Sequence, residues 1–252
     1  MTILNSISFL KGTSVEFYWL KQGHIVLAKT STDLDETGNS YYGQSMLHSL
    51  YIPDKTIQST IQSQFTPEMY HSETNNIFTQ TIISNDVHNV SFDPEHQYIC
   101  LIHGKQPAQL EIYTAIDMKQ ILHLKDVFVN YSLFSHNSQF LAIAGFDNLD
   151  GTVCLYDVKN FKKISTFNAQ CSTEWMWTLD NTSIVCGQCL PRRHYDHVIE
   201  RFGINGKKIE ERKLEVRHCV MFGDVMKDLV EFEYMENVDD TVGGYVPVHL
   251  RN

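Results

Sequence analysis

Four residues have the types and the spacing that a zinc ion could use. Cys186 and Cys189 are separated by two residues, and His194 and His197 follow shortly after them. Thiolate and imidazole ligands together suit tetrahedral zinc. However, the apolar run from Ser183 to Cys189 has the character of a β-strand, in which residues three apart point to opposite faces. We therefore predict core thiols with loop histidines, and neither a metal site nor a cofactor.

Carboxylates gather at one other place, where Asp33, Asp35 and Glu36 lie in a short polar stretch. Calcium prefers several oxygen ligands on a tight loop, but the spacing of a calcium-binding EF-hand loop is not met. A polar turn at the edge of a sheet explains the same residues. The twelve histidines show no repeated ligand spacing, and the sequence contains no nucleophile-elbow or phosphate-loop motif. We predict a protein that is not an enzyme.

Basic side chains are the strongest candidates for binding a partner. Residues 159–217 hold 11 basic and 7 acidic side chains, although the whole chain has a net charge of -10. Such charges, placed by neighbouring strands along one rim, would contact nucleic-acid phosphates. The alternative is a solvated strand edge on which lysines block the addition of another strand. The candidates are Lys162, Lys163, Arg192, Arg193, Lys207, Lys208, Arg212 and Lys213.

Composition predicts a globular chain that can bury a core. Its 252 residues are 42% hydrophobic and 20% charged. No run of about 18 apolar residues is present, and residues 1–10 do not resemble a secretory signal, so we expect a cytoplasmic protein without a membrane segment. The six cysteines lie mostly in apolar runs, which favours reduced thiols.

A repeated pattern of short strands must position these side chains. Residues 127–158 contain three apolar or alternating runs separated by polar turns, which predicts an antiparallel meander. Aligning the ends of the first strands at Phe92, Phe134, Thr178 and Phe222 gives spacings of 42, 44 and 44 residues. Third strands end on an aromatic residue, at Tyr51, Tyr113, Tyr156 and Phe202. A period of about 40 to 45 residues with several strands per unit is typical of propeller blades.

The predicted fold is an all-β, WD40-like propeller with four full four-stranded blades and partial blades at both ends. The blades occupy residues 1–235, interrupted by a polar insertion or loop at 53–85, and 236–252 form a C-terminal extension. Asn205-Gly206 predicts a two-residue hairpin turn. Residues 7–10 and 216–234 read as partial blades that would complete a five-bladed ring if they pair. Otherwise the propeller is open, and a partner chain covers its edges.

Several motifs also resemble the eukaryotic translation initiation factor 2A family. They follow one another in the family's order over nearly the whole chain, although the family's preceding blades and basic tail have no counterpart here. The loop after Pro191-Arg192 and residues 53–85 also depart from the family pattern. The residues that carry the resemblance are Ser31, Asp33, Tyr41, Tyr42 and Gly43, then Gly145, Phe146, Asn148 and Gly151, then Pro191, and finally Tyr245, Pro247 and Arg251.

The resemblance implies a propeller that associates with the small ribosomal subunit and aids initiator tRNA delivery and start-site selection. Messenger RNA and other initiation factors are further partners implied in this way. The alternative function is a propeller scaffold that binds only proteins and has no ribosomal role.

Overall fold

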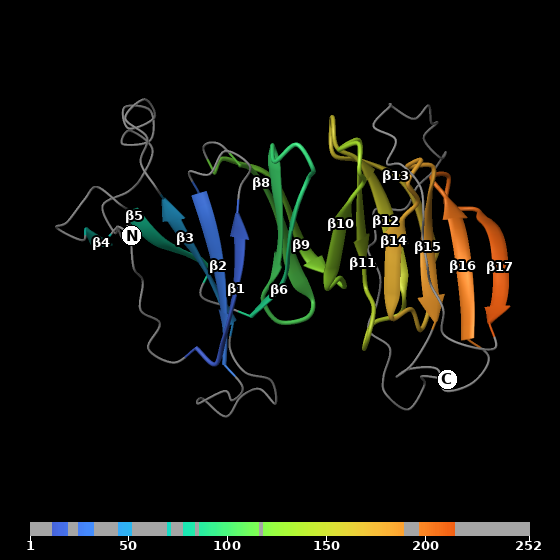
Figure 1. Cartoon of the computed structure of the whole chain (residues 1–252), viewed down its shortest axis with the longest axis horizontal. Coiled ribbons are helices and arrows are strands. Elements are labelled where there is room, and N and C mark those ends of the chain that lie inside the picture. The colour runs from blue at the N-terminus through green and yellow to red at the C-terminus, as the bar shows by residue number, and fades with distance from the viewer. Residues whose placement is uncertain are drawn as a thin grey trace, which may run out of the picture. The chain divides into compact units, whose positions relative to one another are not determined.

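The computed structural model describes residues 12–19, 25–32, 45–51, 70–71, 78–83, 86–115, 118–188 and 197–214. Every regular element within these ranges is a β-strand. The described residues therefore contain no helix that is long and apolar enough to cross a membrane. The strands form four antiparallel sheets, which we call blades 1 to 4 (Figure 1). The chain divides into two compact units, of residues 1–88 with 115–118 and of residues 89–114 with 119–252.

Blade 1 has one strand more than predicted. Its strands are β1 (Ser14–Trp19), β2 (Ile25–Ser31), β3 (Ser45–Tyr51), β5 (Phe78–Ile83) and β4 (Tyr70–His71), in that spatial order. The prediction that residues 53–85 are wholly an insertion or loop is therefore wrong. Phe78–Ile83 pairs with β3 and is the fourth strand of the blade. Phe, Thr and Ile, which make up most of this stretch, are residue types that favour strands.

Blades 2, 3 and 4 are four-stranded meanders with strands in sequence order, as predicted. Blade 2 contains β6 (Val87–Phe92), β7 (Tyr98–His103), β8 (Ala108–Thr114) and β9 (Gln120–Val127). Blade 3 contains β10 (Tyr131–Phe134), β11 (Phe140–Ala144), β12 (Thr152–Asp157) and β13 (Lys162–Asn168). Blade 4 contains β14 (Glu174–Trp177), β15 (Ser183–Gln188), β16 (His197–Gly203) and β17 (Lys208–Leu214).

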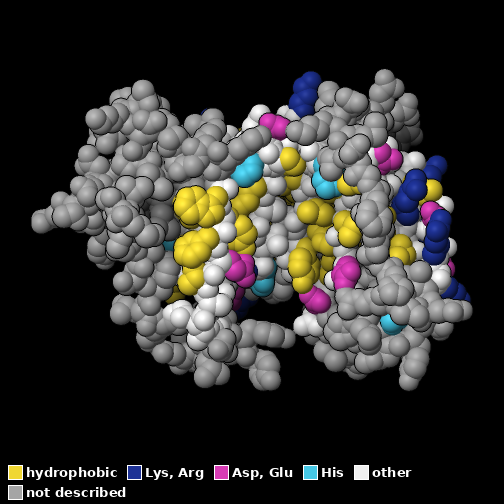
Figure 2. Space-filling view, viewed as in Figure 1, with side chains coloured by type: hydrophobic (Ala, Val, Ile, Leu, Met, Phe, Trp, Pro, Cys, Tyr) yellow, Lys and Arg dark blue, Asp and Glu magenta, His cyan; other side chains and the backbone are white. Residues whose placement is uncertain are grey.

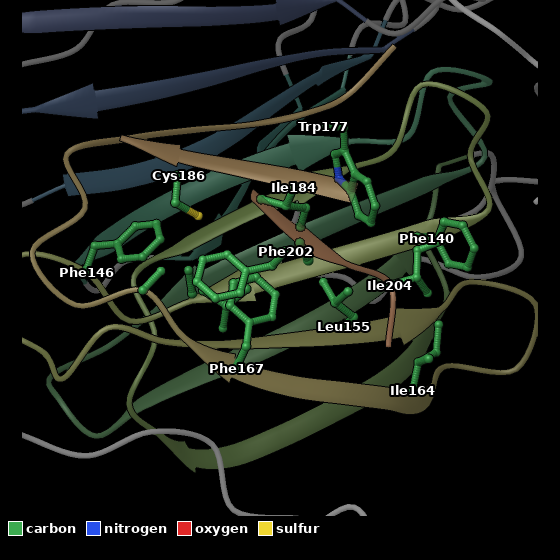
Figure 3. Close-up of a cluster of buried hydrophobic side chains, with 14 residues drawn as sticks. Phe140, Phe146, Leu155, Ile164, Phe167, Trp177, Ile184, Cys186, Phe202 and Ile204 are labelled. Carbon is green, nitrogen blue, oxygen red and sulfur yellow. The ribbon is translucent and has the colours of Figure 1, made fainter. Parts of the chain in front are cut away.

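Apolar faces of blades 2, 3 and 4 pack against each other. All five residues of β11 are buried, as expected of a strand that is covered on both faces. One buried cluster joins blades 2 and 3, and a second joins blades 3 and 4 (Figure 3). In the second, Phe140 stacks on Trp177 with ring centroids 5.7 Å apart, and Phe167 stacks on Phe202 at 4.2 Å. These large rings contribute much of the burial that holds the blades together.

The turn from the first to the second strand is the same in blades 2, 3 and 4. A side-chain oxygen at its first residue accepts the N–H five residues later, and its fourth residue has a positive φ. The first residues are Asp93, Ser135 and Thr178, and the fourth residues are His96 (φ 54°), Ser138 (φ 58°) and Asn181 (φ 56°). Thr178 therefore corresponds to Ser135, and Trp177 to Phe92 and Phe134. The sequence alignment that matched Thr178 to Phe134 was one residue out of register.

A second local correction concerns Asn205-Gly206. The Gly206 N–H donates to Gly203 O at 2.8 Å, the Gly203 N–H donates to Lys207 O at 2.9 Å, and Gly206 has φ 73°. Asn205 is not among the described residues with positive φ. The connection is therefore a three-residue loop with glycine at the left-handed position, which restores the strand register through a bulge, and not the predicted two-residue turn.

Candidate interaction surfaces

The basic candidates do not all lie along one rim. Lys162 and Lys163 begin β13, and Lys207 and Lys208 stand at the start of β17, so these four follow equivalent turns of blades 3 and 4. Arg212 and Lys213 lie at the other end of β17, about 13 to 17 Å away at the usual rise of a strand. Arg212 and Lys213 therefore do not lie on the same rim as the four lysines, although the sequence had led us to expect this. Arg192 and Arg193 lie outside the described residues.

Several of these cations are engaged inside blade 4 or buried. Lys208 Nζ lies 2.7 Å from Glu211 Oε2 and 3.1 Å from Glu200 Oε1. These carboxylates, Glu211 first, raise the pKa of Lys208. Arg212 donates from Nε to Glu210. Lys163 is 8% exposed and is therefore not available to a partner.

Besides Lys208, three of the candidate lysines are exposed, namely Lys162, Lys207 and Lys213. Figure 2 shows the dark blue side chains of Lys and Arg gathered over blade 4. The mixture of glutamates and cations along β17 also suits an outer edge that resists strand addition. Strand β17 therefore suits both a phosphate-binding surface and a protected sheet edge. Because Lys163 is buried and Lys208 is paired with glutamates, fewer lysines than expected are available to phosphates.

The motif residues of blade 3 form a compact turn between β11 and β12. The Gly151 N–H donates to Gly145 O at 2.8 Å, and the Gly145 N–H donates to Thr152 O at 2.9 Å. A Cβ on Gly145 would lie 2.3 Å from Phe128 O, so the backbones approach too closely for any other residue. Phe146 is buried, and its ring meets Trp175 of blade 4 edge to face at 5.3 Å. Of the motif residues here, Asn148 is exposed, and the others build the turn.

The remaining motif residues are mostly outside the described ranges. Ser31 ends β2, and its carbonyl accepts the backbone N–H of Thr13 at 2.8 Å. The motif residues that lie outside are Asp33, Tyr41, Tyr42, Gly43, Pro191, Tyr245, Pro247 and Arg251.

Cys186 lies in the core between blades 3 and 4, as the sequence pattern indicated. Burial raises the pKa of its thiol to about 12, which opposes the thiolate that zinc requires. His197 begins β16, whereas Cys189 and His194 lie outside the described ranges. Among the residues that the structure describes, no three His, Cys, Asp or Glu side chains form a metal-binding group.

Sequence reasoning missed a polar cluster around Glu111 on β8. The Glu111 carboxylate accepts hydrogen bonds from Tyr113 Oη at 2.6 Å and from Gln120 Nε2 at 2.9 Å. His103 Nε2 and His123 Nε2 lie 3.4 and 3.6 Å from its oxygens. The interaction with His103 is the largest cause that lowers the pKa of Glu111, to about 2. The polar alternation of Gln109, Glu111 and Tyr113 was the available signal for this cluster.

The blades and motifs agree with comparison to known proteins. Residues 7–218 match the family model described as eukaryotic translation initiation factor eIF2A. The chain belongs to this family. The eukaryotic translation initiation factor 2A of Dictyostelium discoideum is 24% identical over 202 residues, which cover 77% of this chain and 28% of that protein. The Schizosaccharomyces pombe protein of the same name is 26% identical over 204 residues, or 81% of this chain and 32% of its own.

A solved structure described as a crystal structure of the eukaryotic initiation factor shares the fold. It superposes with a TM-score of 0.62 and 21% identity, covering 84% of this chain and 45% of its own. This eIF2A-family chain thus spans about a third of the length of the curated relatives it matches and under half of the superposed structure.

Proposed function

We propose that this chain is a non-catalytic β-propeller module in translation initiation that associates with the small ribosomal subunit. The observation that carries the proposal is the family match over residues 7–218, because that range contains all four described blades. Aid to initiator tRNA delivery and start-site selection, with messenger RNA and other initiation factors as further partners, belongs to the same proposal. So does a location in the cytoplasm, where ribosomes work.

In this proposal, exposed lysines bind the phosphates of ribosomal RNA. Lys162 and Lys207 stand beside equivalent turns of neighbouring blades, and both are exposed. Lysine contacts to RNA phosphates release counterions, so binding through them weakens as the salt concentration rises. Two such contacts would add a slope of about 2 to the dependence of log affinity on log salt.

Sedimentation with purified small ribosomal subunits over a salt series tests this proposal. We expect co-migration at low salt that declines as salt is added, and a shallower decline for the double variant Lys162→Glu and Lys207→Glu. Lys105→Glu is the matched control, because Lys105 is exposed on the turn between the second and third strands of blade 2, away from these turns. Absence of co-migration even at low salt would overturn the proposal.

A protein-binding scaffold is the second candidate function. The observation in its favour is that Glu200, Glu210 and Glu211 engage the basic side chains of β17. A mixed-charge strand of this kind suits a protein surface of complementary charge better than a row of phosphates.

A further inference from the structure

An exposed lysine holds the same position in blades 2, 3 and 4. It stands at the end of the turn between the third and fourth strands, and the residue directly before it has a positive φ. The lysines are Lys119, Lys162 and Lys207, and the residues before them are Met118 (φ 53°), Phe161 (φ 52°) and Gly206 (φ 73°). We call these three lysines the lysine row.

Backbone pairing fixes this equivalence. In blade 2 the N–H of Thr114 donates to the carbonyl of the row lysine at 2.9 Å, and in blade 4 the N–H of Gly203 donates to it at 2.9 Å. In blade 3, Asp157 is the strand partner of the row lysine. Each of these three residues directly follows the aromatic residue near the end of the third strand. Because blades 2, 3 and 4 pack in succession as repeats of one unit, the lysine row follows one rim of this part of the molecule.

The next residue along each fourth strand is not an exposed, unpaired cation. In blade 2 it is the uncharged Gln120, whose Nε2 donates to Glu111 Oε1 at 2.9 Å. In blade 4 it is Lys208, whose Nζ lies 3.1 Å from Glu200 Oε1, and in blade 3 it is Lys163, which is buried. The position of the lysine row is therefore the one at which all three blades carry an exposed cation.

Exposed aromatic rings do not accompany the lysine row among the described residues. In the described parts of blades 2 to 4, the large hydrophobic side chains that are exposed are Ile121, Tyr131 and Ile209. The one aromatic residue among them, Tyr131, begins β10 and therefore lies at the opposite ends of the strands. Phe161, beside the row, packs edge to face against Tyr98 at 5.4 Å. Proteins that bind single-stranded RNA usually stack bases on exposed rings, whereas double-helical RNA is recognised mainly through phosphates and 2′-hydroxyl groups.

We propose that the lysine row binds the phosphate backbone of a double-helical segment of RNA, with each blade contributing one lysine. Packed sheets lie about 10 Å apart, so three successive blades spread the row over at least about 20 Å. Contacts so far apart engage separate phosphates, and phosphate contacts carry no sequence information. The inference rests on the proposed function and adds to it Lys119, the helical form of the RNA and binding that is independent of sequence.

Fluorescence anisotropy with a short RNA duplex over a salt series tests the lysine row. Three phosphate contacts should lower the affinity by at least about 20-fold between about 50 and 200 mM salt. Lys119→Gln, Lys162→Gln and Lys207→Gln should each make the dependence of log affinity on log salt less steep by about 0.9, because glutamine removes the charge. Lys125→Gln is the matched control, because Lys125 is exposed on the same strand as Gln120 but roughly 20 Å from the row, and it should leave the slope unchanged.

A second duplex of unrelated sequence and a single strand of the same length complete the test. We expect the two duplexes to bind alike and the single strand to bind less tightly, because its charge density is lower. Tighter binding of the single strand, a preference for one duplex, or an unchanged slope in Lys119→Gln would overturn the inference. Thermal unfolding establishes that each variant is folded.

Sedimentation with small ribosomal subunits separates this inference from the proposed function. Co-migration of the wild type together with an unchanged slope in Lys119→Gln overturns the lysine row and leaves the proposed function standing. Duplex binding that depends on all three lysines, without co-migration, supports the lysine row and overturns the association with the subunit.

Discussion

The side chain of Asn181 ties the first turn of blade 4 to the first turn of blade 3. Its Oδ1 accepts the backbone N–H of His136 at 2.8 Å, and Asn181 is completely buried. Ser138 makes the equivalent bond one blade earlier, where its Oγ accepts the backbone N–H of Glu95 at 3.2 Å. A side chain at a left-handed position thus joins blade 3 to the first turn of blade 2, and blade 4 to the first turn of blade 3.

Asn181→Ala should lower the free energy of unfolding by about 2 to 4 kcal/mol. The change leaves a His136 N–H without its acceptor and places an alanine at φ 56°, which asparagine tolerates better. Asn181→Gly is the matched control, because it removes the same acceptor without the backbone strain, and should cost about 1 kcal/mol less. Urea denaturation measures both variants. Equal stability of the alanine variant and the wild type would contradict the role of this bond.

Two glycines with the same φ of 85° should respond very differently to alanine. A Cβ on Gly151 would lie 2.5 Å from the Cα of Gln170, whereas a Cβ on Gly104 would meet nothing within 4 Å. Gly104→Ala should therefore cost only about 1 kcal/mol of left-handed strain, and Gly151→Ala about 3 kcal/mol or more, because backbone must move. Thermal unfolding of the two variants in parallel gives the comparison. Similar losses would show that Gly151 is not held against Gln170.

Trp177 and Trp19 occupy equivalent strand positions, but Trp177 is buried and Trp19 is exposed. Comparing their alanine variants therefore measures how much packing between blades contributes to the free energy of unfolding. Trp177→Ala should destabilise the chain by about 3 to 5 kcal/mol, because it empties a packed site between blades 3 and 4. Trp19→Ala should change the stability of the chain by less than about 1 kcal/mol, because its ring is mostly exposed. Urea denaturation of the two variants in parallel gives the comparison. A large loss in Trp19→Ala would contradict the exposure of its ring.

Acid should weaken the fold in part through Glu111. Its folded pKa of about 2 lies below the ordinary value of 4.5, chiefly because of His103, so its contribution to stability is fully present above about pH 4.5. That contribution falls away as the pH drops from 4.5 toward 2, because the unfolded state then binds the proton more readily. Glu111→Gln should flatten the loss of stability across this window in urea titrations at several pH values. An unchanged pH profile would contradict this assignment.

The arrangement of strands in blades was predictable from two repeated signals in the sequence. These are the alternation of apolar and polar residues along the strands and the aromatic residue near the end of each third strand, such as Tyr156. The register of one blade was not predictable, because Trp177 and Thr178 are both acceptable ends for a strand, and the hydrogen bonds of the turn decide between them. The strand Phe78–Ile83 was missed because its pairing with β3 spans a long polar segment whose composition favours a loop.

The candidate surface was less predictable than the fold. Sequence gives the charge of Lys208 but not the two carboxylates beside its ammonium, which depend on pairing between β16 and β17 and on the bulge at Arg201 and Phe202. The motif glycines were recognised from the sequence as characteristic residues, but the sequence does not show why glycine is required there. At Gly145 the requirement comes from the close approach of Phe128 O, which only the folded structure reveals.

The bonds from Ser138 and Asn181 have a consequence for how blades 2 to 4 come apart. Each bond spans about one repeat and reaches only the adjacent blade, so stability in this part of the chain propagates between nearest neighbours, as in other repeat architectures. Loss of one blade should then weaken first the blade packed beside it, with amides of β11 the slowest to exchange with solvent, because that strand is buried on both sides.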